Sequence, residues 1–409
     1  MTGSPEVWIP KLLSHDEIMV DVVRGGSAKV YRKAFPPSEC SWEDYCQMLT
    51  RLSLFDPESV FFYREGAAYT CREDSPYLAY LDGASIITNK CERAWPWIND
   101  ICRQLRKYFL HIFGVAYLTP PGSFAVRPHS DCQDALILQC KGRKEWDIFD
   151  SPAGLPYPGE EVGKDKPVEN LGDPLYSLTL EEGDLLFVPR GIIHRARTLQ
   201  DADSLHVTIT IPSSDLTYGM MIQRGVGSLL RDPQALPLNV DYFCRRSVHQ
   251  GSLPFRVGVT EEIRDALNAI KNKLTPEYLE ARLKDRISMI NSQQEAARRA
   301  CMAMPKPTGV ISDNSLVRIA CDVKCDVQQP ANGRRFPKAI FTRATDEKLE
   351  VRIRPGDVEI LNTLNKAAPL AFTRVADLPC RDVFEKISVL SILYDKGCIE
   401  LDDDDVVDL

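Results

Sequence analysis

The sequence lacks any long uninterrupted run of apolar residues. No segment of the 409-residue chain approaches the roughly 20 apolar residues that a helix needs to cross a bilayer. The first twenty residues, MTGSPEVWIPKLLSHDEIMV, also lack a basic segment followed by an apolar core and a small-residue cleavage site. We therefore expect neither a signal peptide nor a membrane-spanning helix.

The cysteines show no regular spacing, although there are thirteen of them. A chain of this length can bury large cores without disulfide bonds. Cys321 and Cys325 are the closest pair, but no second pair follows at the spacing of a zinc site. We expect reduced thiols, and with them a cytoplasmic, reducing compartment.

An excess of basic residues is also missing. The formal net charge is −8, and part of it lies in the run Asp402–Asp405 near the C-terminus. An acidic surface repels nucleic-acid backbones and attracts basic partners. Direct nucleic-acid binding is therefore not expected, whereas a basic polypeptide substrate is compatible with the charge.

Two histidines and one aspartate are the strongest candidates for a metal site. His129 and Asp131 are two positions apart in a segment that we predict to be extended, so their side chains leave the same face. His194 follows 65 residues after His129, beyond a Pro189-Arg190-Gly191 turn. Two imidazoles and a carboxylate form the facial triad of non-heme Fe(II) oxygenases. Taken alone, the His-x-Asp pair favours a strand-end histidine hydrogen-bonded to a neighbour over a metal ligand.

The residues around this triad resemble a known family. PHSD is followed by ALILQCKGRKEWDIF, and further on by SLTLEEGDLLFVPRGIIHRA. In order and spacing these motifs resemble the JmjC branch of the cupin oxygenases, and within it the ribosomal-oxygenase type (bifunctional lysine demethylase and histidyl-hydroxylase). The resemblance is dense from Asp82 to Ile211. It implies a double-stranded β-helix that binds Fe(II) through His129, Asp131 and His194 and uses 2-oxoglutarate as cosubstrate.

Lys144 is predicted to lie on an apolar strand face with Trp146 and Ile148. Burying an unpaired ammonium is very costly, so this position predicts an anionic partner. The alternative is an edge strand from which the lysine reaches water. The resemblance implies that Lys144 pairs with the distal carboxylate of 2-oxoglutarate.

Two further residues are candidates for cosubstrate contacts. Tyr117 resembles a family residue whose hydroxyl reaches 2-oxoglutarate, although this chain has Val115 where the family often has asparagine two positions earlier. In SLHVTIT, His206 shares a predicted strand face with Thr208, opposite an apolar face. His206 is either cosubstrate-facing or a core histidine with its hydrogen bonds satisfied.

The fold class predicted for the chain is α+β in three domains. Residues 1–213 form the JmjC cupin domain with an N-terminal extension, in which we expect a helix capped by Ser41 and another that stops at Gly114. Residues 214–305 carry helical apolar stripes, which the resemblance identifies as a dimerisation domain of a homodimer; the alternative is that they pack on the barrel. Residues 306–409 resemble a winged-helix tail, predicted as helices followed by a strand pair.

The function predicted from the sequence is hydroxylation of an amino-acid side chain in a protein or peptide substrate by an Fe(II)- and 2-oxoglutarate-dependent dioxygenase. The same chemistry on a small molecule or biosynthetic peptide is one alternative, and histone demethylation is another. A cupin that binds a ligand without catalysis belongs to a different class, as does a zinc hydrolase.

Overall fold

The computed structural model describes residues 5–13, 26–71, 73–151, 160–248, 253–329, 337–367, 371–380 and 382–402. Residues 403–405 of the acidic run therefore lie outside the described residues. Within the described part, no helix is long and apolar enough to cross a membrane. All thirteen cysteines are free.

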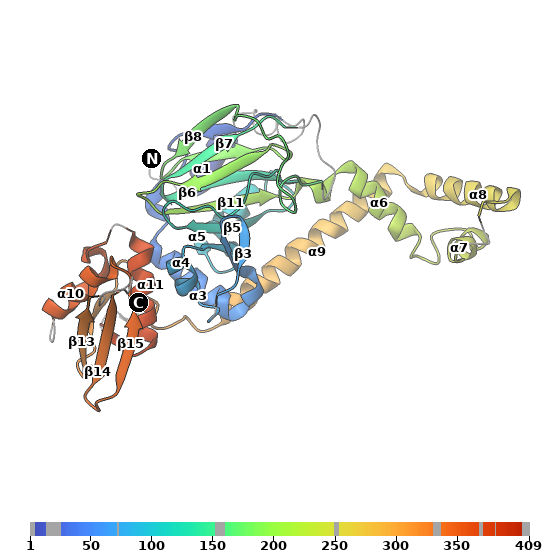
Figure 1. Cartoon of the computed structure of the whole chain (residues 1–409). Coiled ribbons are helices and arrows are strands. Elements are labelled where there is room, and N and C mark those ends of the chain that lie inside the picture. The colour runs from blue at the N-terminus through green and yellow to red at the C-terminus, as the bar shows by residue number, and fades with distance from the viewer. Residues whose placement is uncertain are drawn as a thin grey trace.

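Two antiparallel sheets form the centre of the molecule (Figure 1). The large sheet has eight strands, in the order β1 (Lys29–Tyr31), β9 (Leu185–Val188), β6 (Asp134–Gly142), β11 (Ser204–Ile211), β5 (Phe113–Thr119), β4 (Ser85–Asn89), β2 (Val60–Arg64) and β3 (Ala67–Tyr69). The small sheet has the order β10 (His194–Thr198), β7 (Lys144–Ile148) and β8 (Tyr176–Leu180). Two antiparallel sheets with added helices agree with the fold class predicted from the sequence, which is α+β.

The two faces of strand β11 have different surroundings. Alternate residues of a strand face opposite sides. Leu205 and Val207 belong to the large core that the helices cover, whereas His206 and Thr208 face the cavity on the other side. The two faces predicted for SLHVTIT are confirmed. A second core, contributed by both sheets, includes Ile137 of β6 and Trp146 of β7.

The predicted strand, turn and strand between Ala135 and Phe149 is present, but its two strands do not pair with each other. β6 lies in the large sheet and β7 in the small one. The chain crosses between them at Gly142, whose φ of +64° is in the left-handed region. A Cβ at this position would collide with the carbonyl oxygen of Asp203, so only glycine fits the crossing.

Among the described residues of the N-terminal part, the helices that cover the large sheet are α1 (Pro5–Leu13), α3 (Trp42–Phe55), α4 (Pro76–Leu81) and α5 (Pro96–Leu105). The predicted Ser41 cap is confirmed, because its hydroxyl accepts a hydrogen bond from the Asp44 amide over 3.0 Å. Short 3-10 helices lie at Pro37–Glu39, Pro57–Ser59, Cys91–Arg93, Ser213–Leu216 and Val375–Asp377.

The helix stop predicted at Gly114 is wrong. Helix α5 ends at Leu105, and Gly114 is the second residue of strand β5. Its amide donates to Glu92 Oε2 over 2.9 Å, and a Cβ would come within 2.9 Å of Ile98 Cγ2. The glycine thus allows close packing of strand against helix and does not end the helix.

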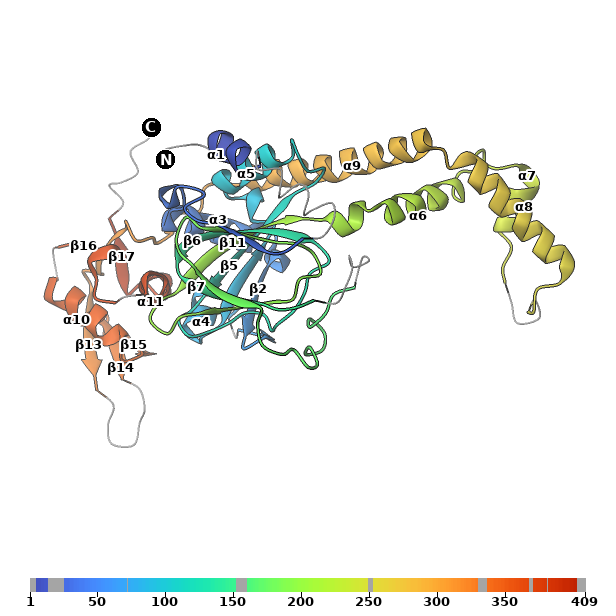
Figure 2. The same ribbon diagram turned by 90° about the horizontal axis from the view of Figure 1, so that it is seen from above.

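A helical arm projects from the sheets (Figure 2). It consists of α6 (Tyr218–Leu229), α7 (Leu238–Cys244), α8 (Val257–Lys273) and α9 (Pro276–Ala303). The last of these helices runs back to the N-terminal part of the chain, where Gln294 Nε2 donates to Glu92 Oε1 over 2.7 Å and to the Ile112 carbonyl over 2.9 Å. Arg51 Nη1 donates to the carbonyl oxygens of Cys301 and Met304 over 3.0 and 2.9 Å at the end of α9.

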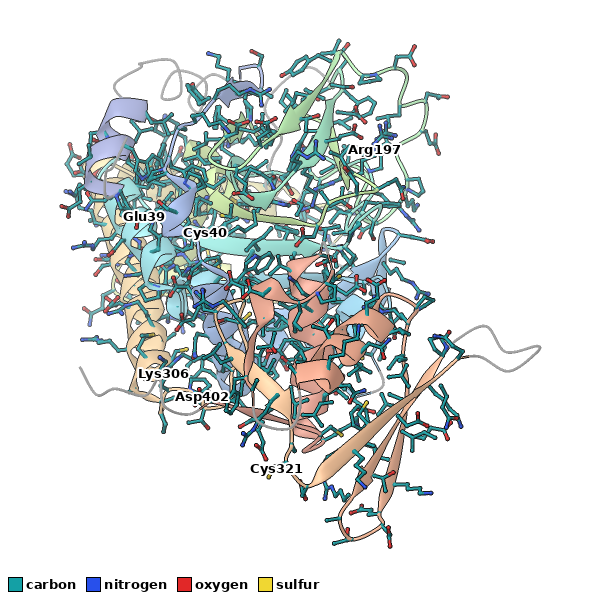
Figure 3. All side chains as sticks on the ribbon, turned by 90° about the vertical axis from the view of Figure 1, so that its left-hand side faces the viewer. Glu39, Cys40, Arg197, Lys306, Cys321 and Asp402 are labelled. Atoms are coloured by element: carbon teal, nitrogen blue, oxygen red, sulfur yellow. The ribbon has the colours of Figure 1, made fainter. Side chains whose placement is uncertain are left out.

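The C-terminal part packs beside α4 (Figure 1). In the view of Figure 3, its residue Cys321 lies far from Arg197 of the small sheet. Its elements are β12 (Leu316–Ile319), β13 (Val323–Gln328), β14 (Lys338–Arg343), β15 (Lys348–Arg352), α10 (Asp357–Ala367), β16 (Thr373–Arg374), α11 (Val383–Asp395) and β17 (Ile399–Leu401). The predicted order of helices followed by a strand pair is incomplete, because the sheet β13-β14-β15 precedes both helices and β17 alone follows them. Phe384 of α11 packs edge-on against Tyr80, with ring centroids 4.9 Å apart.

Candidate functional site

His129 and His194 lie side by side as an isolated antiparallel backbone pair. The His129 amide donates to the His194 carbonyl over 3.0 Å, and the His194 amide donates back over 2.9 Å. Their ring centroids are 4.4 Å apart. His194 begins β10, whereas His129 lies between β5 and β6 in a segment without regular strand structure. The extended strand predicted around His129 is therefore reduced to this single pair.

Asp131 completes the cluster. The Gly191 amide of the predicted turn donates to the Asp131 carbonyl over 2.7 Å, so the turn before β10 holds the aspartate backbone. Asp131 Oδ2 is 3.8 Å from Nε2 of His129 and 3.8 Å from Nε2 of His194. The ligand atoms of the three residues all lie within 4.8 Å of one another, and in the described part of the chain this is the one group that could hold a metal ion.

Two backbone carbonyls orient the imidazoles. His129 Nδ1 lies 2.7 Å from the Arg127 carbonyl, and His194 Nδ1 lies 3.0 Å from the Ile192 carbonyl. A carbonyl can only accept, so each Nδ1 carries the proton and each Nε2 offers a lone pair toward Asp131. These carbonyls are partners that side-chain patterns in the sequence do not reveal.

The electrostatics suit cation binding. Burial, and then the neighbouring His194, lower the pKa of His129 to about 4, so its ring is neutral at pH 7. Burial alone would raise the pKa of Asp131, but His129, His194 and Lys164 together lower it, which keeps the carboxylate ionised. Two imidazole nitrogens and one carboxylate are the donor set of a non-heme Fe(II) centre, and the residues present fit that ion.

Lys144 is buried beside this cluster, with 1% of its surface exposed. Its strand β7 is the central strand of the small sheet, so the predicted alternative of an edge strand reaching water is wrong. Its Nζ donates to Thr119 Oγ1 over 2.9 Å and lies 3.4 Å from His206 Nδ1. No carboxylate of the described residues lies within ion-pair distance of it, and burial lowers the pKa of Lys144 to about 7.

Tyr117 and His206 form a stacked pair across β5 and β11. Their ring centroids are 4.8 Å apart and their planes differ by 3°. Burial, and then Lys144 and His194, lower the pKa of His206 well below its ordinary value. His206 is therefore a neutral ring whose Nδ1 accepts from Lys144.

All six candidate residues line one cavity, together with small and apolar side chains. Its lining is Tyr117, Ala125, Val126, His129, Asp131, Ala135, Ile137, Lys144, Trp146, His194, Ala196, His206 and Thr208. A second cavity shares Tyr117 and Asp131 with the first and extends to Phe61 and Phe113. Val115 lines the second cavity, whereas Lys144 lines the first.

Sequence reasoning missed Thr119 and Lys164, which contact Lys144 and Asp131 respectively. Thr119 ends a strand just before two prolines, and Lys164 lies in a charged loop 33 residues after Asp131. Neither position carries a motif or periodicity, so contact in the folded chain is the only signal that identifies them.

A JmjC domain model matches residues 91–217. Over 365 residues the chain is 26% identical to the bifunctional lysine-specific demethylase and histidyl-hydroxylase NO66 of Drosophila mojavensis, covering 83% of this chain and 39% of that protein. It is 27% identical over 336 residues to the protein of the same name from Dictyostelium discoideum, covering 73% and 61%. The chain thus spans less than two thirds of the length of these relatives. Among solved structures, YcfD of Escherichia coli is similar at 13% identity with a TM-score of 0.44, covering 94% of this chain and 98% of that one.

Proposed function

We propose that this chain, in which residues 91–217 match the JmjC domain, is an Fe(II)- and 2-oxoglutarate-dependent oxygenase that hydroxylates an amino-acid side chain in a protein or peptide. One observation carries the proposal. Three metal-ligand atoms converge within 4.8 Å, and a buried lysine without an anionic partner among the described residues lines the same cavity.

Each residue has a definable task in this reaction. His129 Nε2, His194 Nε2 and one oxygen of Asp131 would hold the metal, a donor set that would leave further coordination positions for the cosubstrate and dioxygen. Lys144 supplies the positive charge for the distal carboxylate of 2-oxoglutarate, with Thr119 and His206 holding its ammonium in place. Tyr117 lines the same cavity and stacks on His206. Bound Fe(II) with 2-oxoglutarate supplies the activation of dioxygen that hydroxylation requires.

The experiment that tests the centre is succinate release from 2-oxoglutarate with Fe(II), measured for the wild type and for His129→Ala. We expect the variant to lose turnover. His111→Ala is the matched control, because His111 is a half-buried histidine bonded to Asn291 on the arm, outside the cavity. Undiminished succinate formation by His129→Ala would rule out this centre.

The substrate class rests on the relatives and on the cavity. The relatives are named as histidyl-hydroxylases and lysine demethylases, which makes histidine-containing peptides the first substrates to test. A mass increase of 16 on a peptide supports the proposal. Formaldehyde release identifies demethylation instead, and a 16-unit increase on a metabolite alone identifies a small-molecule hydroxylase. Metal binding without turnover on any substrate supports a non-catalytic cupin.

The proposed domain boundaries are 1–213, 214–305 and 306–409, and the middle domain is proposed to form a homodimer. The arm exposes large apolar side chains that the rest of the chain does not cover. Those exposed by more than 60% are Tyr218, Leu238, Tyr242, Val248, Val257 and Leu267. Exposed apolar surface of this kind is typical of a protein interface.

The C-terminal domain is proposed to be a winged-helix-like module that docks on the catalytic domain. Most of the helix α11 is buried, including Phe384, Ile387 and Leu390. A helix that reads DNA needs an exposed basic face. Its burial against α4 supports a structural or partner-docking role and not DNA binding.

A further inference from the structure

Residues 161–164, in the loop between β7 and β8, lie against residues 130–132, which include the proposed metal ligand Asp131. The Ser130 amide donates to the Val162 carbonyl over 2.9 Å, and the Val162 amide donates to Ser130 Oγ over 3.2 Å. The Cys132 amide donates to Glu161 Oε1 over 3.4 Å. Backbone and side-chain bonds thus join residues 161 and 162 to both neighbours of Asp131.

Lys164 in this segment contacts Asp131 itself. Its Nζ lies 2.6 Å from Asp131 Oδ1 and 3.0 Å from Glu161 Oε1. The other oxygen, Oδ2, is the one that faces the two histidines. The two oxygens of the carboxylate therefore have different surroundings: one faces the imidazole nitrogens, and the other faces an ammonium.

We propose that Lys164, held by Glu161, is a positioning residue that restrains the Asp131 carboxylate so that a single oxygen is presented to the metal. This inference rests on the proposed function. A carboxylate with both oxygens unrestrained can rotate about its Cβ–Cγ bond or bind through both oxygens. A charge-assisted hydrogen bond to Oδ1 opposes both changes.

Gly163 shows that the chain is adapted to this approach. Its φ is +86°, and a Cβ there would collide with the Pro128 carbonyl oxygen and come within 2.9 Å of His129 Cα. Only glycine lets the backbone pass so close to the metal-ligand segment while adopting this conformation. The close approach of the backbone at Gly163 places the next residue, Lys164, in contact with Asp131.

An ordinary surface ion pair is the competing interpretation, since the side chain of Lys164 is 37% exposed. Such pairs contribute little and are screened by salt. A second possibility is that the ammonium only occupies the place of the cation and hinders its entry. The three interpretations differ in the affinity for metal: positioning predicts weaker binding without the lysine, a surface pair predicts no change, and a place-holder predicts tighter binding.

The test is the dissociation constant for Co(II), measured on the full chain by its visible absorption and by calorimetry without 2-oxoglutarate. We expect Lys164→Met to weaken Co(II) binding about 10- to 100-fold, as is usual when the partner of a metal ligand is removed. Lys164→Arg should recover most of the affinity, because it keeps a charged donor. Lys166→Met is the matched control, since it removes an exposed lysine from the same loop.

Thermal unfolding of the metal-free variants checks that each one folds. Affinity of Lys164→Met equal to that of the wild type, or tighter, overturns the positioning role while leaving the metal centre intact. A wild type that binds Co(II) no better than His129→Ala overturns the metal centre itself, and the inference falls with it. The two failures are therefore distinguishable.

Discussion

The ammonium of Lys144 donates a 2.9 Å hydrogen bond to the hydroxyl of Thr119, which links the small sheet to the large one. Both side chains are buried, at 1% and 0% exposure. Among the described residues this buried ammonium contacts a hydroxyl and an imidazole but no carboxylate, and a dicarboxylate ligand would supply the missing counter-charge. The position of this lysine therefore determines several measurable properties of the protein.

Lys144→Met should weaken binding of 2-oxoglutarate. A hydrogen bond to a charged group contributes about 1.5–3 kcal/mol, which corresponds to about a 10- to 150-fold higher dissociation constant. Calorimetry with the Co(II)-loaded protein measures it, and the affinity for Co(II) itself should stay unchanged. Lys141→Met is the control, because Lys141 lies outside the cavity near the end of β6. Equal 2-oxoglutarate affinity in all three proteins would contradict the role of Lys144.

Binding of 2-oxoglutarate should take up protons at pH 7–8. Burial lowers the pKa of Lys144 to about 7, so above this pH the ligand-free protein holds a growing fraction of neutral amine. A bound carboxylate favours the ammonium and raises its pKa. The affinity should consequently fall as the pH rises above 7. Calorimetry in buffers of different ionisation enthalpy measures the uptake, and Lys144→Met should abolish it.

The same group affects the stability of the ligand-free fold with the opposite dependence on pH. The pKa of Lys144 is about 7 in the folded chain and 10.5 ordinarily, so the unfolded chain binds more protons between these values. The cost of burying the charge is fully present below pH 7 and fades as the pH rises toward 10.5. Thermal unfolding should show a smaller gain in stability over this range for Lys144→Met than for the wild type.

Gly142→Ala should destabilise the protein more than Gly172→Ala. Both glycines have φ near +65°, so alanine costs about 1–2 kcal/mol at either position from the left-handed conformation alone. At Gly142 the new Cβ also collides with Asp203, whereas at Gly172 nothing lies within 4 Å. Denaturant unfolding measures both variants, and equal losses would show that the crossing between sheets tolerates a side chain.

The proposed homodimer can be tested on the arm. Replacing the exposed Leu238 and Leu267 by aspartate should leave the monomer fold intact, because these side chains are 83% and 62% exposed. The charges should prevent an apolar interface from closing. Sedimentation equilibrium is expected to show a dimer for the wild type and a monomer for the double variant. A monomeric wild type at micromolar concentration would refute dimerisation.

Local sequence patterns predicted the secondary-structure elements well where buried side chains recur with the periodicity of a strand or a helix. The faces of β11 and the Ser41 cap depend on neighbours within a few residues, and both are present as predicted. The convergence of His129, Asp131 and His194 was predicted from motif order and resemblance. The end of α5 and the separation of β6 from β7 depend on distant contacts, Ile98 with Gly114 and Asp203 with Gly142, which no local pattern records.

The candidate site also contains both kinds of residue: some are identified by a local pattern, and others only by their contacts in the fold. Residues with a motif or a costly position, such as Lys144, could be identified from the sequence, because a lysine on an apolar face requires an explanation. Lys164 could not, since a lysine in a charged loop looks like any solvated residue until the fold brings it to Asp131.

The contacts that α9 makes with the JmjC-matching residues limit where the chain can be truncated. One oxygen of Glu92, which is 1% exposed, receives a hydrogen bond from Gln294, and Arg51 bonds the carbonyls at the end of the same helix. A fragment cut at residue 213 would keep both side chains but lose the donor to Glu92 Oε1 and the carbonyls that Arg51 bonds, while the Gly114 amide would still donate to Glu92 Oε2. The half of the chain that carries the candidate metal site is therefore not a self-sufficient piece. A shortened version that still folds has to retain the final turns of α9, joined to the two sheets by a linker in place of the arm.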